Sequence, residues 1–265
     1  MPKKRNIIDQ SVIQNATKTL LANIRFSNVD EPICSIVMTS SVPNEGKSTI
    51  SVHLAEAIAS SGKRCLIVEC DMRKRSLYRH LGARPTAGLY SVLTDQVSLE
   101  QAVVETNYAN LFFLDAEPSI PNPADIISSK RFGKLLQILE ERYDYVLLDT
   151  PPVGTFVDAA ILSSMVDATV FVVRENFAKR DEIVNAFNQL KKAGANVIGA
   201  VLNYCQDEGA SSSYYYDYYN KRDDGGRARS ASTRAQQPAV AAARPMNKPV
   251  EGTRFKTRPH PLSFT

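Results

Sequence analysis

The chain has 265 residues, of which 43% are hydrophobic and 23% charged, an ordinary balance for a globular protein that does not by itself name a function. This length suffices for one large domain, or two small ones, with a buried core. The net charge of +4 is uneven, because residues 1–219 contain 22 Lys and Arg against 25 Asp and Glu, whereas residues 220–265 contain 10 against 3. The basic character therefore belongs to the C-terminal part.

The N-terminal residues, the lengths of the apolar runs and the cysteine spacing argue against a targeting segment and a zinc site. The N-terminal residues MPKKRNIIDQ are basic but have no apolar core behind them, so they are not a secretory signal. No run reaches the roughly 18–20 apolar residues that a membrane-spanning helix needs. The cysteines form no CxxC pair and have no histidine cluster, and most fall in apolar runs, which predicts reduced thiols in a cytoplasmic protein. They are Cys34, Cys65, Cys70 and Cys205.

The first 31 residues are predicted to be a polar leader with one helix. Within them, residues 13–26 carry apolar side chains at helical spacing, at Ile13, Ala16, Leu20 and Ile24. We expect this leader to precede a separate domain at residues 32–204.

Residues 32–204 alternate short apolar runs with longer amphipathic segments. The apolar runs are continuous, which is typical of parallel strands buried on both faces, and they occupy residues 33–40, 64–70, 110–116, 143–150, 167–175 and 196–204. Helices are predicted between them at 48–61, 98–106, 130–142 and 181–193. This alternation predicts one α/β domain with a doubly wound, mostly parallel sheet and helices on both faces.

The remaining residues have a different composition. Residues 205–220 combine small polar residues with a tyrosine cluster and are predicted to be a flexible segment. Residues 221–265 have no periodic apolar face, so they are predicted to be a disordered basic tail. Such a tail either attracts anionic surfaces weakly or is solvated without a partner.

A phosphate-binding loop follows the first predicted strand. Residues 41–49, SVPNEGKST, match GxxxxGK[ST], with Ser41 in place of the first glycine, in the context of a P-loop NTPase fold. A strand before the loop and a helix after it argue against a chance turn, because backbone N–H groups and a helix N-terminus together cradle phosphates. In such a loop Gly46 permits close approach, Lys47 reaches the β- and γ-phosphates, and Ser48 binds Mg²⁺. ATP and Mg²⁺ are therefore the expected ligands, with nucleotide contacts from Asn44, Glu45, Gly46, Lys47, Ser48 and Thr49.

Two apolar runs end in carboxylates. The run LIVECDMRK places Glu69, Asp71 and Arg73 on one side of an extended chain, and VLLDTPP places Asp149 at the end of another strand. Ligands bind at the carboxyl ends of the strands in open α/β sheets. Ser48, Asp71 and Asp149 are thus the expected Mg²⁺ ligands. The alternatives are that Asp149 caps a turn and that Glu69 only orients its neighbours.

Together these motifs resemble the bacterial tyrosine kinases that control capsule and exopolysaccharide synthesis. The resemblance covers about residues 33–204, and the tyrosine cluster extends it to about 219. Members carry Walker A, DxDxR-type Walker A′ and DxxP-type Walker B motifs, which correspond here to residues 41–49, 69–73 and 149–152. The resemblance implies catalytic roles for Lys47, Glu69, Asp71 and Asp149, with Asp71 as the base for a tyrosine hydroxyl.

The tyrosine cluster is the expected phosphate acceptor. The resemblance implies that the tail of one subunit enters the active site of its neighbour, and that phosphorylation breaks up a ring-shaped homo-oligomer. A flexible segment suits this role, whereas an adhesive aromatic patch or a nucleic-acid stacking surface are the alternatives. The expected autophosphorylation sites are Tyr214, Tyr215, Tyr216, Tyr218 and Tyr219.

Some positions separate this chain from related proteins. The partition and cell-division ATPases of the superfamily carry an extra P-loop lysine, which would stand at Val42 here. Asn203 resembles the superfamily's adenine-reading asparagine, although a strand-end turn residue is the alternative. Glu69 stands where the kinases have Asp. The ExxRxxR oligomerisation motif of the kinases would fall on Asn15, Lys18 and Leu21.

The resemblance also implies partners. Many members are fused behind a transmembrane polysaccharide co-polymerase, and this chain resembles the split form, a cytoplasmic kinase that a separate membrane activator recruits to the membrane. A cognate phosphotyrosine phosphatase is a further expected partner, and nucleic acid is not. Two other functions stay open: an ATP-binding regulatory switch for the co-polymerase without tyrosine transfer, and a partition-type ATPase that uses the basic tail on DNA.

Overall fold

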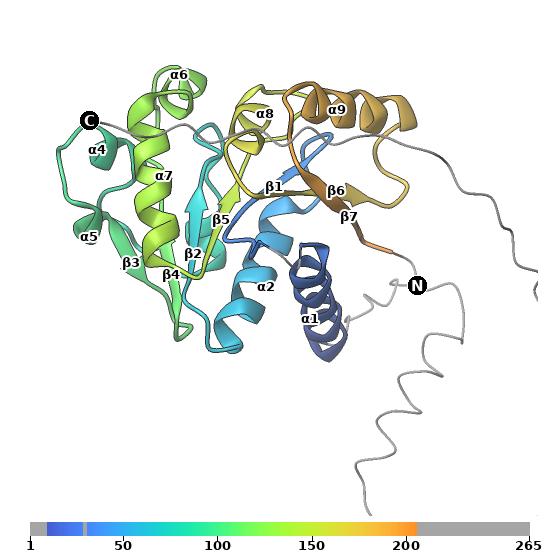
Figure 1. Cartoon of the computed structure of the whole chain (residues 1–265), viewed down its shortest axis with the longest axis horizontal. Helices are drawn as coiled ribbons and strands as arrows, with labels where there is room; N and C mark the ends of the chain where they lie inside the picture. The colour runs from blue at the N-terminus through green and yellow to red at the C-terminus, as the bar shows by residue number, and fades with distance from the viewer. Residues whose placement is uncertain (1–9, 29–30, 206–265) are drawn as a thin grey trace, which may run out of the picture. The chain divides into compact units, whose positions relative to one another are not determined.

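A seven-stranded sheet forms the centre of the protein (Figure 1). The computed structural model describes residues 10–28 and 31–205. The strands lie in the order β3-β4-β2-β5-β1-β6-β7, and every neighbouring pair is parallel except β3 and β4. Their bounds are β1 Ser35–Ser40, β2 Cys65–Glu69, β3 Val103–Glu105, β4 Leu111–Leu114, β5 Tyr145–Asp149, β6 Ala168–Arg174 and β7 Val197–Asn203.

Helices cover both faces of this sheet. Alternate residues of each strand point to opposite faces, so each strand contributes side chains to the cores on both sides. Ile36 and Met38 of β1 belong to a core shared with α1, α2 and α3, whereas Val37 belongs to a core shared with α4 to α8. Helices α8 and α9 also cover Phe171 of β6. The doubly wound α/β fold is therefore confirmed. The helices are α1 Gln10–Ser27, α2 Lys47–Ser60, α3 Leu77–His80, α4 Leu89–Leu93, α5 Leu99–Ala102, α6 Pro123–Ile127, α7 Lys130–Arg142, α8 Asp158–Ser163 and α9 Arg180–Lys192.

The predicted helix at 98–106 is wrong in its second half. Ser98 and Gln101 form a capping box that starts α5, but this helix ends at Ala102 and the next three residues form β3, antiparallel to β4. Val103 and Val104 are β-branched, so they lose side-chain freedom in a helix and fit a sheet edge. The six predicted strands and the other three predicted helices of the domain lie within two residues of their expected ends.

Burial differs from expectation at the two ends of the described chain. The run at 196–204 is not buried on both faces, because β7 lies at the edge of the sheet and Leu202 is 57% exposed. The N-terminal helix lies beside α2 in Figure 1, and its residues Leu21 and Ile24 are buried in the core. Leu21, where the kinases' oligomerisation motif would end, therefore offers no surface to another subunit.

Several expectations concern residues beyond this core. The flexible segment and the basic tail, with all five cluster tyrosines, lie outside the described residues except for Cys205. In the described part of the chain, no helix has the length and apolar character needed to cross a membrane. The four cysteines lie in that part and are unpaired, and Cys65 and Cys70 are fully buried, as expected for small hydrophobes.

Candidate active site

The P-loop between β1 and α2 is held in shape by its own glutamate. The fully buried Glu45 carboxylate accepts hydrogen bonds from the Ser41 hydroxyl at 2.8 Å, the Val42 N–H at 2.8 Å and the Arg174 N–H at 3.2 Å. The side chain of Glu45, which was predicted as a nucleotide contact, therefore lies on the buried side of the loop. It shapes the backbone that would meet the phosphates.

Asn203, at the end of β7, braces the same loop. Its Nδ2 atom donates a hydrogen bond to the carbonyl oxygen of Glu45 at 2.9 Å. Gly46 has a φ of +91°, which favours glycine, and a Cβ atom there would stand 2.1 Å from that nitrogen and so displace the Asn203 amide from Glu45. The next residue, Tyr204, lies under the Arg174 guanidinium, 4.3 Å from its ring centroid. The predicted adenine contact is therefore also part of the loop's support.

We expect Gly46→Ala to weaken ADP binding at least about tenfold, because the loop must hold a disfavoured φ and the displaced Asn203 amide no longer donates to the Glu45 carbonyl. Gly62→Ala is the matched control: Gly62 has a φ of +83°, but nothing lies within 4 Å of its Cβ position. That control should lose about 1 kcal/mol of stability and no affinity for ADP. Isothermal titration calorimetry measures the ADP affinity of both variants. Equal ADP affinities of Gly46→Ala and Gly62→Ala would contradict this explanation.

Asp149 lies fully buried at the end of β5, between two serine hydroxyls. The Ser48 hydroxyl donates to Oδ2 at 2.6 Å, and the Ser51 hydroxyl donates to Oδ1 at 2.9 Å. Burial raises the pKa of Asp149 to about 6, although the nearby Lys47 charge and the two hydroxyls act to lower it. Asp149 therefore reaches the P-loop through Ser48, as expected of a residue that organises the ligands of a metal ion.

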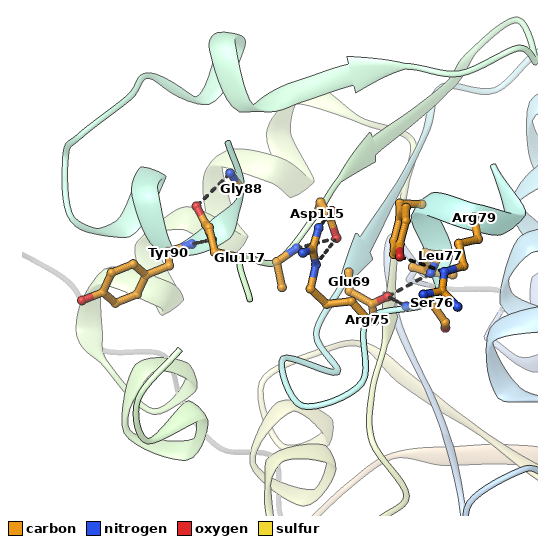
Figure 2. Close-up of polar contacts among 11 residues, drawn as sticks. Glu69, Arg75, Ser76, Leu77, Arg79, Gly88, Tyr90, Asp115 and Glu117 are labelled. Carbon is orange, nitrogen blue, oxygen red and sulfur yellow. Dashed lines mark hydrogen bonds and ion pairs between the residues drawn. The ribbon is translucent and has the colours of Figure 1, made fainter. Parts of the chain in front are cut away.

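Glu69 orders the loop that follows β2. It is fully buried and stands opposite Asp149 in the register of β2 and β5. Its carboxylate accepts hydrogen bonds from the N–H groups of Asp71 at 3.2 Å, Ser76 at 2.7 Å and Leu77 at 3.0 Å; Figure 2 shows the last two. Burial, with the nearby Asp149 charge, raises the pKa of Glu69. This geometry favours the interpretation that Glu69 orients its neighbours.

Asp71 faces the P-loop across a cavity of about 410 Å³, here called the phosphate cavity. Its carboxylate accepts hydrogen bonds from the N–H groups of Lys74 at 2.9 Å and Arg73 at 3.3 Å. Burial raises the pKa of Asp71, while these N–H groups and Lys47 act to lower it. The predicted site residues that line the phosphate cavity are Asn44, Gly46, Lys47, Ser48, Thr49 and Asp71. The others, Glu45, Glu69, Asp149 and Asn203, support the residues that line it.

The structure adds three residues that the sequence patterns missed, which are Phe156, Asp158 and Ser51. Arg73 forms an ion pair with the buried Asp158 at 3.3 Å and stacks over Phe156, 4.3 Å from the ring centroid. Asp158 is 85 residues away along the chain, so no local pattern could reveal this pair. Ser51 was detectable, because it follows Ser48 at the i,i+3 spacing that shares a helix face.

The oxygen donors around Ser48 suit Mg²⁺. This ion prefers hard oxygen ligands and usually binds through one or two carboxylates, with water and phosphate oxygens completing its shell. Asp149, Asp71 and the Ser48 hydroxyl are such donors. Among the residues that the structure describes, no three His, Cys, Asp or Glu side chains are grouped to hold a metal by themselves. A metal ion here would therefore depend on phosphate oxygens as well.

The chain matches a family model and several known proteins. The model, described as an AAA domain, covers residues 36–198. Tyrosine-protein kinase YwqD of Bacillus subtilis is 34% identical over 204 residues, covering 76% of this chain and 86% of the relative. Putative tyrosine-protein kinase CapB of Staphylococcus aureus is 33% identical over 211 residues, covering 77% and 92%.

Solved structures agree with these sequence matches. The crystal structure of the chimerical protein CapA2B2 superposes with a TM-score of 0.71 at 32% identity, covering 77% of this chain and 88% of that one. The Pyrococcus furiosus cell division ATPase MinD superposes with a TM-score of 0.57 at 22% identity, covering 71% and 79%. At that identity the second likeness shows a shared fold alone.

Proposed function

The chain belongs to the bacterial tyrosine-protein kinases, and from that membership we propose that it transfers the γ-phosphoryl group of ATP to the five tyrosines within residues 214–219 of a second copy. One observation carries the proposal. The P-loop, Lys47, the Ser48–Asp149 pair and Asp71 converge on the phosphate cavity from segments that are distant in the sequence. This arrangement matches the needs of phosphoryl transfer, which are positioning and neutralisation of charge.

Lys47 and the N-terminal turn of α2 hold the phosphates. The first N–H groups of a helix have no partner within the helix, so those of α2 are available to phosphate oxygens at the loop. Lys47 is only 8% exposed and lines the cavity, which places a fixed positive charge near the phosphates. Both features neutralise charge that develops on the transferred group.

Asp71 receives the proton in the proposed reaction. The acceptor tyrosine oxygen forms a bond to the γ-phosphorus while the bond from that phosphorus to the β,γ-bridging oxygen breaks, and ADP leaves with the electron pair. The hydroxyl proton passes to the Asp71 carboxylate. Because burial raises the pKa of this carboxyl, it holds a proton better than an exposed aspartate does.

Ser48 and Asp71 would hold Mg²⁺, and Asp149, predicted as a third ligand, would act through the Ser48 hydroxyl that it orients. When bound, the ion supplies positive charge at the β- and γ-phosphate oxygens. The Ser48 hydroxyl donates its proton to Asp149 and accepts a hydrogen bond from the Ser76 hydroxyl at 3.1 Å, so one lone pair of its oxygen is left for a cation. Glu69 acts through the backbone of Asp71, which it positions.

The same membership supports a biological setting. We place the kinase in the cytoplasm, attached peripherally to the membrane through a transmembrane polysaccharide co-polymerase that activates it. Its tyrosine phosphorylation would regulate capsule or exopolysaccharide synthesis and export, with a cognate phosphotyrosine phosphatase reversing the modification. A homo-oligomer would present the tail of one subunit to the site of the next.

Mass spectrometry of the full chain after incubation with ATP and Mg²⁺ tests the proposal. We expect phosphate on tyrosines in the 214–219 segment, with and without the cytoplasmic end of an activator supplied. A variant with these five tyrosines changed to phenylalanine should bind ATP equally well and gain no phosphate there. ATP binding by the wild-type chain without any phosphotyrosine, even with the activator, would contradict the proposal and indicate an ATP-dependent switch.

A further inference from the structure

The two edges of the sheet differ in how they are protected. At one edge, β3 has three residues, and one of them is the exposed Glu105. Short strands and charged side chains are usual means by which proteins keep an edge from pairing with another chain. At the other edge, β7 has seven residues, and none of them is charged or a proline (Figure 1). The β7 edge is therefore of the kind that pairs with a further strand.

Alternate backbone groups of β7 point away from its neighbour β6. The Asn203 carbonyl oxygen accepts a hydrogen bond from the Glu175 N–H, so it points toward the β6 side. Because these groups alternate in direction along a strand, the N–H and C=O groups of Ala200 and Leu202 point to the free edge. The Leu202 carbonyl accepts a hydrogen bond there from the Cys205 thiol, a weak donor, at 3.5 Å. Ala200 and Leu202 can therefore bond to a further strand.

The side chains along this edge leave room for that strand. Gly199 and Ala200 are small and exposed, and no atom of the described residues lies within 4 Å of a Cβ position at Gly199. Leu202 is 57% exposed. On the side of α1, a cavity of about 170 Å³ is lined by Gly199 and Val201. A further strand would therefore meet apolar surface that the described part of the chain leaves open.

The β7 edge is complementary to a second copy of itself laid antiparallel. When the two copies of Val201 stand opposite each other, each Ala200 stands opposite the Leu202 of the other copy. Opposite residues share a face of the sheet, so the exposed Leu202 packs against the small Ala200. Each such pair exchanges both of its N–H···O=C bonds, because these are the residues whose backbone groups point outward.

We propose that the β7 edge binds the β7 edge of a second copy of this chain, in the antiparallel register with Val201 at the two-fold axis. No charged residue stands between Lys192 and Asp207 in the sequence, so two identical edges approach without repulsion of like charges. A two-fold pair also covers both free edges at once. It sets the two phosphate cavities at opposite ends of a continuous sheet, since each lies at the carboxyl ends of its own strands.

Disulfide formation at chosen positions tests this register in the full-length chain carrying Cys205→Ser. Val201→Cys places two thiols at the two-fold axis, where opposite Cα atoms of a non-hydrogen-bonded pair are about 4.5 Å apart, a distance that a disulfide can span. Leu202→Cys is the matched control. Leu202 is the more exposed residue, but its two copies would have Cα atoms about 8–9 Å apart, which is too far for a disulfide.

Each variant is oxidised with copper phenanthroline in the absence of ATP, and the disulfide-linked dimer is measured over time on non-reducing gels. We expect Val201→Cys to form this dimer at least tenfold faster than Leu202→Cys. Random collision would favour the more exposed thiol, so equal rates, or a faster rate in Leu202→Cys, would overturn the proposed pair. No disulfide at either position would also overturn it and would indicate a different occupant of the edge.

A lysine at the edge should separate the two copies. Leu202→Lys, added to the Val201→Cys chain, places like charges across the pair, and we expect the dimer to form at least tenfold more slowly. Ile138→Lys is the control, because it adds the same charge at a residue of α7 that is 40% exposed, and the dimer should form at the parent rate. Equal rates in the two lysine variants would overturn the pair. Without ATP, neither result depends on the proposed kinase function.

Discussion

Replacing Lys47 by alanine is expected to reduce tyrosine phosphorylation at least about a thousandfold. Lys47 is the first residue of α2, and its side chain lines the phosphate cavity while remaining only 8% exposed. Its charge acts on Asp149 and Asp71 as well, since it lowers the pKa of both. Because water solvates the γ-phosphate less strongly than a positioned positive charge does, it does not replace the lost Lys47 charge there.

The matched control is Lys63→Ala. Lys63 forms an exposed ion pair with Asp144 at 2.9 Å, and its side chain is 51% exposed. The substitution removes the same charge from the protein, yet exposed pairs of this kind stabilise by at most about 1 kcal/mol. We expect its phosphorylation rate to equal that of the wild type. Quantitative anti-phosphotyrosine detection compares the three proteins, and more than a tenth of the wild-type rate in Lys47→Ala would refute the assigned role.

Asp149→Asn is expected to abolish phosphorylation and yet to stabilise the metal-free protein. The folded state holds the pKa of Asp149 at about 6, above its ordinary value of 3.8. Between these values the folded state retains a proton that the unfolded state releases, so the free energy of unfolding falls as pH rises through this window and stays lower above it. The shift corresponds to a penalty on the order of 3 kcal/mol at pH 8. Asparagine removes the charge but accepts fewer hydrogen bonds from Ser48 and Ser51, so the expected gain is about 1–2 kcal/mol.

Urea unfolding at pH 4.5 and pH 8, without Mg²⁺, measures this effect. The higher free energy of unfolding of Asp149→Asn, relative to the wild type, should be present at pH 8. It should become small at pH 4.5, where the Asp149 carboxyl of the folded wild type is largely protonated. Asp144→Asn is the control, and its expected effect on the free energy of unfolding has the opposite sign. Hydrogen bonds from Lys63 and the Arg64 N–H lower the pKa of Asp144, so its charged form stabilises the fold. That variant should lose a little stability at pH 8 and keep its kinase activity. Lower stability of Asp149→Asn than wild type at pH 8 would contradict the prediction.

The P-loop and the sheet could be predicted from sequence because their signals are local. Continuous apolar runs mark strands that helices cover on both sides, and GKS between a strand and a helix marks a phosphate cradle. The error at residues 98–106 arose where local signals conflict: the capping box of Ser98 starts a helix, whereas Val103 and Val104 prefer a strand. Residues 103–105 form a strand because they pair with β4, and β4 is formed by residues further along the chain.

The chain's own sequence determined the fold class, the order of its main elements and the residue types that surround a nucleotide. Only the tertiary structure decided what several of them do. The Glu45 carboxylate accepts a hydrogen bond from Ser41 and supports the loop from within. Glu69 accepts hydrogen bonds from the backbone around Asp71, and the Asn203 amide lies beside Gly46. The physical reason is that burial, pKa and hydrogen-bond partners depend on strand register and on chain segments that meet only after folding. The ion pair between Arg73 and the buried Asp158 shows the same dependence, since the two residues stand 85 positions apart along the chain and meet only in the fold.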